Sequence, residues 1–284
     1  MGLRALLLLF AGCRYGFALA PDAHAPDEAA ADTSTPADAT TTVQKPDASA
    51  IDAAPPIDGT PGFGGYTITD TTAPYALLAG APVAGFVAGA DDENYPFALP
   101  FTFTFYGVPY TALTISMNGY VAFDAPASGA DTSLNDCPMD TTAPGAMIAL
   151  FWDDLYANPS APSTGALAYQ LSGAAPDRRL TVEWRDMDAF YPAGPNAFSQ
   201  GVRVTQALVL HETGTIEMHY GPRLPPKSPN KDCGADRHRG CSATVGLEAP
   251  GSALFANVQC GTSAGPGPGY TPIDEGRLLL FVPN

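Results

Sequence analysis

Hydrophobic and polar residues alternate with a period of two along much of the chain that follows Gly62. In residues 99–105, a leucine and three phenylalanines occupy every second position, with proline or threonine between them. Successive side chains of a strand point to opposite faces, so this pattern predicts a strand with one buried face. Burial of the three rings contributes about 2–3 kcal/mol each, and we expect this strand to be central to the core. No window shows the sustained 3.6-residue period of a helix.

Two hairpins have clear turn signals. Asn118-Gly119 lies between the strand-like residues 113–117 and 120–123. Asn-Gly accommodates the two positive φ angles of a type I′ turn, so we predict that turn here.

The hairpin of residues 204–210 and 216–220 is predicted to close through a three-residue loop with Gly214 in the left-handed conformation. This loop places Leu210 opposite Ile216, and it places the next inward-facing pair two residues further along. The apolar residues of both strands then lie on the core side.

The remaining alternating stretches complete an all-β pattern. Residues 166–171 and 180–184 predict another hairpin, in which Leu180, Val182 and Trp184 share one face. Further strands are expected at residues 66–69, 147–152, 242–247 and 277–282. Many short strands with frequent turns and no crossover helices indicate an antiparallel β-sandwich, which we assign to residues 61–284.

The order of these segments resembles a known domain. The strings are LPFTFTFYG (99–107), ISMNGYVAF (115–123), IALFWDDL (148–155), RRLTVEW (178–184), ALVLHETGTIEMHYG (207–221) and ATVGLE (243–248). Together they resemble the nidogen-like (NIDO-like) β domain of extracellular proteins and of many bacterial surface lipoproteins. The resemblance implies an adhesion or recognition module and transfers no catalytic residues.

The first residues predict export. A single basic residue, Arg4, precedes an apolar run of residues 5–12, which is too short to span a bilayer and is typical of a signal peptide. Residues 9–13, LFAGC, resemble a bacterial lipobox, so residues 1–12 are predicted to be a lipoprotein signal peptide and Cys13 the lipidated residue. Cleavage after Ala18-Leu19-Ala20, giving a secreted soluble protein, is the alternative.

Residues 13–60 are predicted to be a disordered tether. From residue 21 to 60 there is no aromatic residue, and alanine, aspartate, threonine and proline dominate. Such a segment cannot bury enough apolar surface to offset the entropy lost on ordering. Repeated prolines and like charges favour an extended spacer between a membrane and the folded head.

Charge excludes some partners. The chain has 29 acidic and 13 basic residues, a net charge of −16 and a pI near 4.3. We therefore expect no nucleic-acid partner and no electrostatic binding to an anionic bilayer. Contact with the membrane is expected through the lipid anchor alone, at a bacterial outer membrane or cell surface.

Four cysteines follow Cys13, and an even number in an exported chain predicts two disulfides. Cys233 and Cys241 bracket a short polar loop, so we pair them and pair Cys137 with Cys260, although three pairings are open. A zinc site is the rival interpretation, but the usual spacing of ligands is missing.

Asp153 and Asp154 end the strand of residues 148–152 and are the first candidate site. They could bind calcium, serve in a glycosidase, or accept backbone hydrogen bonds at a turn. Because adjacent strand residues point to opposite faces, they are poorly placed to act as a pair. A second acidic group, Asp91, Asp92 and Glu93, has the same alternatives.

Ligand binding is expected in the loops after residues 148–152 and 178–184. The candidate residues are Asp153, Asp154, Tyr156, Asp186, Asp188, Phe190 and Tyr191. Their rings could stack on a ligand, and their carboxylates could accept sugar hydroxyls or bind calcium. The alternative is that Phe190 and Tyr191 close the end of the sandwich.

The histidines and basic residues of the head do not indicate a metal site or a catalytic site. His211 and His219 are predicted to be surface residues too far apart to share a metal ion. Arg237, His238 and Arg239 form a basic group, expected to be a solvated loop or an element that binds an anionic partner.

No motif for a serine hydrolase, metalloprotease or phosphate loop is present. The sequence therefore predicts a lipid-anchored, non-enzymatic binding or adhesion module for a glycan or another surface protein. A glycan-processing enzyme and a purely structural envelope lipoprotein are the alternatives. Calcium is the one cofactor that the acidic residues suggest.

Overall fold

The computed structural model describes residues 65–123, 135, 145–159, 164–189, 202–224, 237–251, 255–262, 265–266 and 270–284. The predicted signal peptide and tether, with Cys13, lie outside these residues, as do Cys137, Cys233, Phe190 and Tyr191. The predictions made for these positions therefore stay predictions. Within the described residues, no helix has the length and apolar character needed to cross a membrane.

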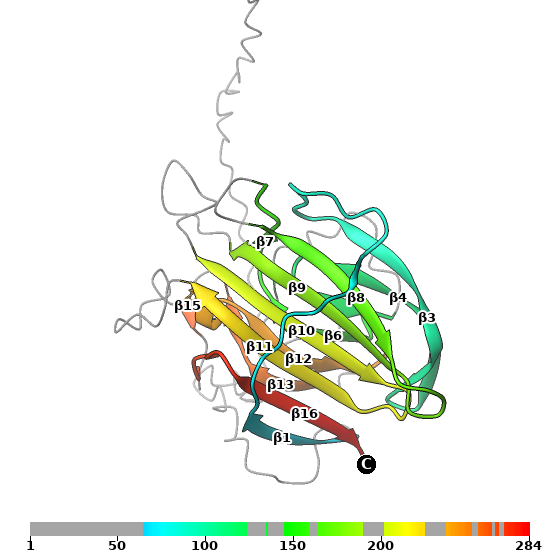
Figure 1. Ribbon diagram of the computed structural model, residues 1–284. Coiled ribbons are helices and arrows are strands. Elements are labelled where there is room, and N and C mark those ends of the chain that lie inside the picture. The colour runs from blue at the N-terminus through cyan, green and yellow to red at the C-terminus, as the bar shows by residue number, and fades with distance from the viewer. Residues whose placement is uncertain are drawn as a thin grey trace, which may run out of the picture. The chain divides into compact units, whose positions relative to one another are not determined.

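The described strands form two large antiparallel sheets. The strands of the first sheet are β1 (Tyr66–Thr72), β2 (Ala81–Pro82), β7 (Leu155–Tyr156), β8 (Ala166–Ser172), β9 (Arg179–Ala189), β10 (Arg203–His211), β11 (Ile216–Leu224) and β16 (Arg277–Pro283). Their order is β1-β16-β11-β10-β9-β8-β2, and β7 pairs with β9. Figure 1 shows this sheet in front of the second one.

The second sheet has the order β13-β12-β6-β5-β4-β3. Its strands are β3 (Asn94–Phe105), β4 (Val108–Ser116), β5 (Tyr120–Ala122), β6 (Met147–Trp152), β12 (Thr244–Glu248) and β13 (Phe255–Gln259). Two short strands, β14 (Gly261–Thr262) and β15 (Gly265–Pro266), pair with each other, and η1 (Arg237–Arg239) is a 3-10 helix. The predicted all-β sandwich is confirmed (Figure 1).

The core lies between the two sheets. Trp184 of β9 is fully buried and donates its indole N–H to the carbonyl of Ser116 in β4, at 2.8 Å. Tyr220 of β11 is also buried and donates its hydroxyl to the carbonyl of Leu150 in β6, at 2.8 Å. These bonds satisfy polar atoms within the core and join the sheets at defined positions.

The predicted register of the β10–β11 hairpin is confirmed. Leu210 pairs with Ile216, Leu208 pairs with Met218, and all four side chains belong to the core. Gly214 has a φ of 91°, the left-handed conformation that the three-residue loop requires.

The turn at Asn118 differs from the prediction. Ser116 pairs with Tyr120, so three residues form the loop, and among them only Gly119 has a positive φ. The hairpin is present, but the predicted type I′ turn is wrong. Asn118 is buried and its side chain binds neighbouring loops, and these tertiary contacts replace the local preference of Asn-Gly.

The phenylalanine-rich strand contributes to the core, as predicted. Phe101, Phe103 and Phe105 are buried, as predicted, but their strand β3 is at the edge of its sheet. The period of two reports which side chains face the core and carries no information on the number of neighbouring strands.

Candidate functional site

Three carboxylates from two separate loops meet at one end of the sandwich. Asp91 and Asp92 lie just before β3, and Asp154 lies between β6 and β7. One oxygen of each carboxylate lies within 4.8 Å of the others. We call Asp91, Asp92 and Asp154 the carboxylate cluster. Oxygen atoms of this kind are the ligands that calcium prefers.

Asn118 holds the two loops together. Its amide nitrogen donates to Oδ1 of Asp92 at 2.9 Å, and its Oδ1 accepts the backbone N–H of Leu155 at 2.9 Å. The backbone N–H of Met117 also donates to the carbonyl of Glu93 at 3.0 Å. The sequence identified both acidic loops but missed this connection, because the role of Asn118 was assigned to a local turn.

Burial and repulsion from neighbouring carboxylates raise the pKa values of Asp91 and Asp154. The pKa of Asp91 is raised to about 6 by burial and by the charges of Asp92 and Glu93. The pKa of Asp154 is raised to about 7, again by burial first and then by Asp91 and Asp92. In addition, Oδ1 of Asp91 is buried and makes no hydrogen bond in the described part of the chain. A divalent cation would stabilise the ionised form of these groups.

Asp153 has different surroundings. Its buried carboxylate accepts the hydroxyl of Ser242 at 2.5 Å and the backbone N–H of Asp154 at 3.0 Å. One oxygen also lies 3.9 Å from the guanidinium of Arg237. Burial raises the pKa of Asp153, and the nearby Arg237 opposes that shift. The two adjacent aspartates thus face opposite sides, as the strand geometry implied, and the metal-ligand group contains Asp154 without Asp153.

The predicted ligand loop after residue 184 begins later than expected. Strand β9 continues to Ala189, so Asp186 and Asp188 are strand residues and not loop residues. Pairing with β7 and β10 extends β9 beyond the alternating segment from which the strand was predicted.

Both of these carboxylates have protein partners. Asp186 forms an ion pair with Arg203, with N–O distances of 2.8 and 2.9 Å. Asp188 is buried, accepts the amide of Asn158 at 2.7 Å, and pairs through its backbone with the half-buried Tyr156. Asp186 and Asp188 therefore stabilise the junction of β7, β9 and β10.

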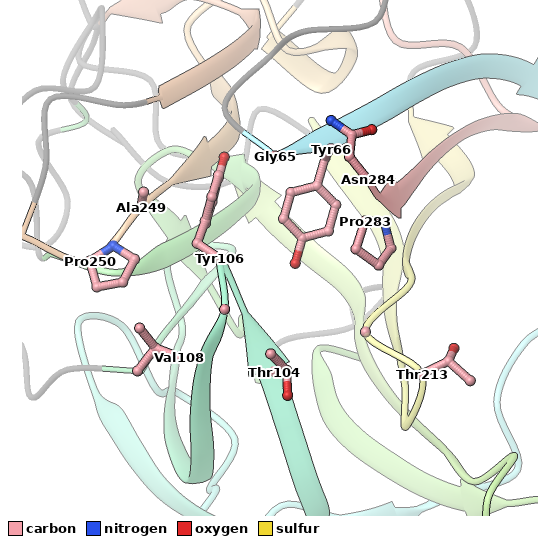
Figure 2. A pocket seen from close by; sticks show the side chains of 12 residues that line it. Gly65, Tyr66, Thr104, Tyr106, Val108, Thr213, Ala249, Pro250, Pro283 and Asn284 are labelled. Carbon is pink, nitrogen blue, oxygen red and sulfur yellow. The ribbon is translucent and has the colours of Figure 1, made fainter.

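A groove of about 640 Å³ lies at the opposite end of β3. It is lined by Gly65, Tyr66, Thr104, Tyr106, Gly107, Val108, Thr213, Gly214, Ala249, Pro250, Pro283 and Asn284, none of which has a charged side chain. We call it the uncharged groove (Figure 2). No local sequence pattern indicates this groove, because its walls come from five separate segments.

Two tyrosines shape the groove. In Figure 2 the hydroxyl of Tyr66 points toward the space between Tyr106, Thr104 and Pro283. The rings of Tyr66 and Tyr106 pack edge to face, with centroids 5.1 Å apart. Tyr106 has a φ of 48° and Gly107 a φ of 78°, as in a two-residue hairpin turn. This turn joins β3 to β4 and presents the ring of Tyr106 to the groove.

The cysteine predictions are tested only in part. Cys241 and Cys260 are disulfide-bonded. The predicted partners, Cys233 and Cys137, lie outside the described residues, so both pairings stay predictions.

The two sheet histidines share a carboxylate. Nε2 of His211 lies 2.8 Å from Oε1 of Glu217, and Nε2 of His219 lies 2.6 Å from Oε2 of the same residue. The hydrogen bonds, first that of His219, lower the pKa of Glu217 to about 2. The histidines belong to no group of metal ligands among the described residues.

The basic group at residues 237–239 is not a solvated loop. Arg237, His238 and Arg239 form η1 and are all buried. Arg239 forms an ion pair with Asp274, with N–O distances of 2.7 and 3.1 Å.

Comparison with known proteins gives one match. A family model described as NIDO related matches residues 65–268. No curated protein and no solved structure matches the chain. The matched range contains the whole carboxylate cluster and most of the lining of the uncharged groove.

Proposed function

The chain belongs to the NIDO-related family, and from this premise we propose that its head is a binding module of a cell-surface protein and not an enzyme. The uncharged groove is the observation that carries the proposal. In a chain of net charge −16, no charged side chain lines it. Its volume of about 640 Å³ lies within the range of about 300–1,000 Å³ that is usual for ligand sites.

The lining favours a neutral glycan. A charged ligand would lose hydration in this groove without gaining a charged side chain as a partner. The lining contains the polar residues Thr104, Thr213 and Asn284, which can form hydrogen bonds, and the ring of Tyr106, on which a sugar can stack. Another surface protein is the alternative ligand.

A glycan array probed with the full chain tests this proposal. We expect retention of neutral glycans without cleavage, and Tyr106→Ala is expected to weaken binding at least tenfold. Tyr156→Ala, at the other end of the head, is the matched control and is expected to bind normally. If only Tyr156→Ala lost binding, the ligand site would lie in the loops predicted from the sequence and not in the uncharged groove. Release of product would favour a glycan-processing enzyme, and no binding would favour a structural protein or a protein ligand.

We propose that a lipid on Cys13 holds this module at the bacterial surface, with residues 13–60 as a spacer. The apolar run that ends next to Cys13 supports this anchor. Cys13→Ser should leave the membrane fraction or remain unprocessed. A mature N-terminus at Pro21 would show instead that the protein is secreted in soluble form.

Two disulfides are part of the same proposal. The bonded state of Cys241 and Cys260 supports them, and we retain the pairs Cys233–Cys241 and Cys137–Cys260. Peptide mapping without reduction reads the pairing directly. A peptide linking Cys137 to Cys233 would overturn the pairing, and free thiols in exported protein would overturn both bonds.

A second function, calcium binding, is supported by the carboxylate cluster. Its three oxygens come from two loops, and Asn118 fixes those loops relative to each other. Calcium uses six to eight oxygen ligands, so water or further protein oxygens would complete its shell. The ion would relieve the repulsion among Asp91, Asp92 and Asp154 and order the loops around Asn118.

Thermal unfolding with and without calcium tests this second function. At about 100 times its dissociation constant, a ligand of the native state adds about 2.7 kcal/mol of stability. Asp154→Asn should abolish the rise in melting temperature, and Asp177→Asn, an exposed turn residue, is the control. No shift at millimolar calcium, or an equal shift in both variants, would refute the site.

A further inference from the structure

Arg223 is a buried cation inside the sandwich. It lies on β11 and is 7% exposed. One residue of β10 lies between Val204 and Gln206, whereas two residues of β11 lie between their partners Arg223 and Tyr220. This bulge turns Arg223 to the side on which Tyr220 lies. Its guanidinium carbon lies 5.0 Å from the ring centre of Phe151 and 5.3 Å from that of Tyr220.

One edge of this guanidinium has no partner among the described residues. Nη1 donates to Oε1 of Gln206 at 3.1 Å, while Nε and Nη2 are buried and make no hydrogen bond in the described part of the chain. Nε and Nη2 form the fork that matches the two oxygens of a carboxylate or a phosphate. The rings of Phe151 and Tyr220 hold the plane of the fork, so its direction is set before any ligand binds.

Further buried nitrogens near Arg223 lack partners in the part of the chain that the structure describes. The amide nitrogen of Gln206 and both ring nitrogens of His238 make no hydrogen bond within the described residues. Both side chains are fully buried. Burial lowers the pKa of His238 to about 4, and the positive charge of Arg223 contributes to that shift. The imidazole is therefore neutral at pH 7 and offers one N–H donor.

No carboxylate among the described residues forms an ion pair with Arg223. Asp274, one of the acids that act on its charge, binds Arg239 with both oxygens. Burial lowers the pKa of Arg223 to about 10, so it remains protonated at neutral pH. A buried charge without a counter-ion costs several kcal/mol, which a bound anion would offset.

We propose that Arg223, Gln206 and His238 form an internal site for an oxyanion, a carboxylate or phosphate group that the fork of Arg223 binds through two parallel hydrogen bonds. The amide of Gln206 and the ring N–H of His238 donate to the same group. This site does not depend on the uncharged groove or on calcium.

Anion titration of the full chain tests the proposal. Melting temperature is measured against phosphate and against acetate, with sodium chloride keeping the ionic strength constant. We expect a rise that saturates with at least one of the two anions. Arg223→Met should remove the saturable rise, whereas Arg179→Met, an exposed residue of β9, should retain it. The absence of a saturable rise in the unchanged chain, or an equal rise in Arg223→Met, would overturn the proposal.

Arg223→Lys keeps the test valid if Arg223→Met does not fold. Lysine retains the charge but has no fork, so the anion should bind at least about tenfold more weakly. Equal affinity in Arg223→Lys would overturn the two-bond geometry. Asp232 and Asp236 lie outside the described residues between β11 and η1. A further outcome is a saturable rise of the melting temperature with anion that appears only after both are changed to asparagine. In that case one of the chain's own carboxylates occupies the fork, and the proposal is overturned.

Discussion

The two ends of β3 differ in how their loops are stabilised. At the Asn94 end, Asn118 is buried, Asp91 and Asp154 are half-buried, and Asp92 is exposed and is tied to the neighbouring loops through Asn118. At the Phe105 end, the loops surround the uncharged groove and meet through tyrosine, proline and valine. The loops at one end of the sandwich are thus stabilised through charged and amide groups, and the loops at the other end are stabilised through the packing of uncharged side chains.

The backbone allows a direct comparison of these ends. Gly119 lies in the loop before β5 with a φ of 77°, and Gly107 lies in the loop before β4 with a φ of 78°. A Cβ added at Gly119 would lie 2.0 Å from the carbonyl oxygen of Phe151, whereas one added at Gly107 would have no neighbour within 4 Å. The two glycines have the same conformation and differ only in their surroundings.

Gly119→Ala is expected to have the largest effect. The left-handed conformation costs alanine about 1–2 kcal/mol, and the clash with Phe151 adds about 1–3 kcal/mol. The carbonyl of Gly119 also accepts the N–H groups of Leu150 and Phe151, so displacement of the loop would disturb β6. We expect a loss of about 3 kcal/mol or more in urea unfolding, followed by the fluorescence of the buried Trp152 and Trp184. A loss below 1 kcal/mol would show that the loop at Gly119 moves away from Phe151 at little cost, and it would contradict the tight packing that we infer for this end.

Asp153→Ala is expected to cost nearly as much. The change removes the carboxylate beside Arg237 and the acceptor of the hydroxyl of Ser242. Removal of one member of a buried ion pair costs about 3–5 kcal/mol, and the 3.9 Å separation from Arg237 favours the lower value.

Ser242→Ala is the matched variant for Asp153, because it removes one hydrogen bond and keeps the charge pair. Its cost should be about 1 kcal/mol in the same unfolding measurement. Equal losses in Asp153→Ala and Ser242→Ala would mean that the ion pair contributes nothing.

Sequence patterns predicted what depends on local periodicity. The alternation in β9 and β10 gave the buried face, and the position of Gly214 gave the register of the β10–β11 hairpin. The full length of β9 was missed because the strand continues through a bulge at Asp186, which has a φ of 54°. At such a bulge the period of two no longer reports the face of a side chain.

The site was predicted only in its parts. Asp91, Asp92 and Asp154 were each recognised as acidic loop residues, but their meeting depends on the pairing of β3 through β6. The inward position of Arg223 depends on another bulge, and the uncharged groove depends on five segments meeting at one end. No local pattern encodes these contacts.

The pH dependence of stability should differ between the ends. The folded-state pKa values of Asp91 and Asp154 are raised to about 6 and about 7, above their ordinary value of 3.8. The folded state therefore binds more protons than the unfolded state between about pH 4 and pH 7, and stability falls as pH rises through this window. Without calcium, Asp154→Asn should flatten this fall in melting temperature, while Tyr106→Ala at the groove end should leave it unchanged. A fall of the same size in Asp154→Asn would mean that other groups cause it.

Gly107→Ala is expected to have a much smaller effect than Gly119→Ala. Alanine must adopt a φ near 78° there, at a cost of about 1–2 kcal/mol, but its methyl group enters open space beside the uncharged groove. The free energy of unfolding should therefore fall by about 1 kcal/mol, which urea denaturation resolves. Since Gly119→Ala carries the same conformational cost, the difference between the two variants measures how tightly each loop is packed. If Gly107→Ala cost as much as Gly119→Ala, the loop at the groove end would be packed as tightly as the loop at Asn118. That result would contradict the open space found around Gly107.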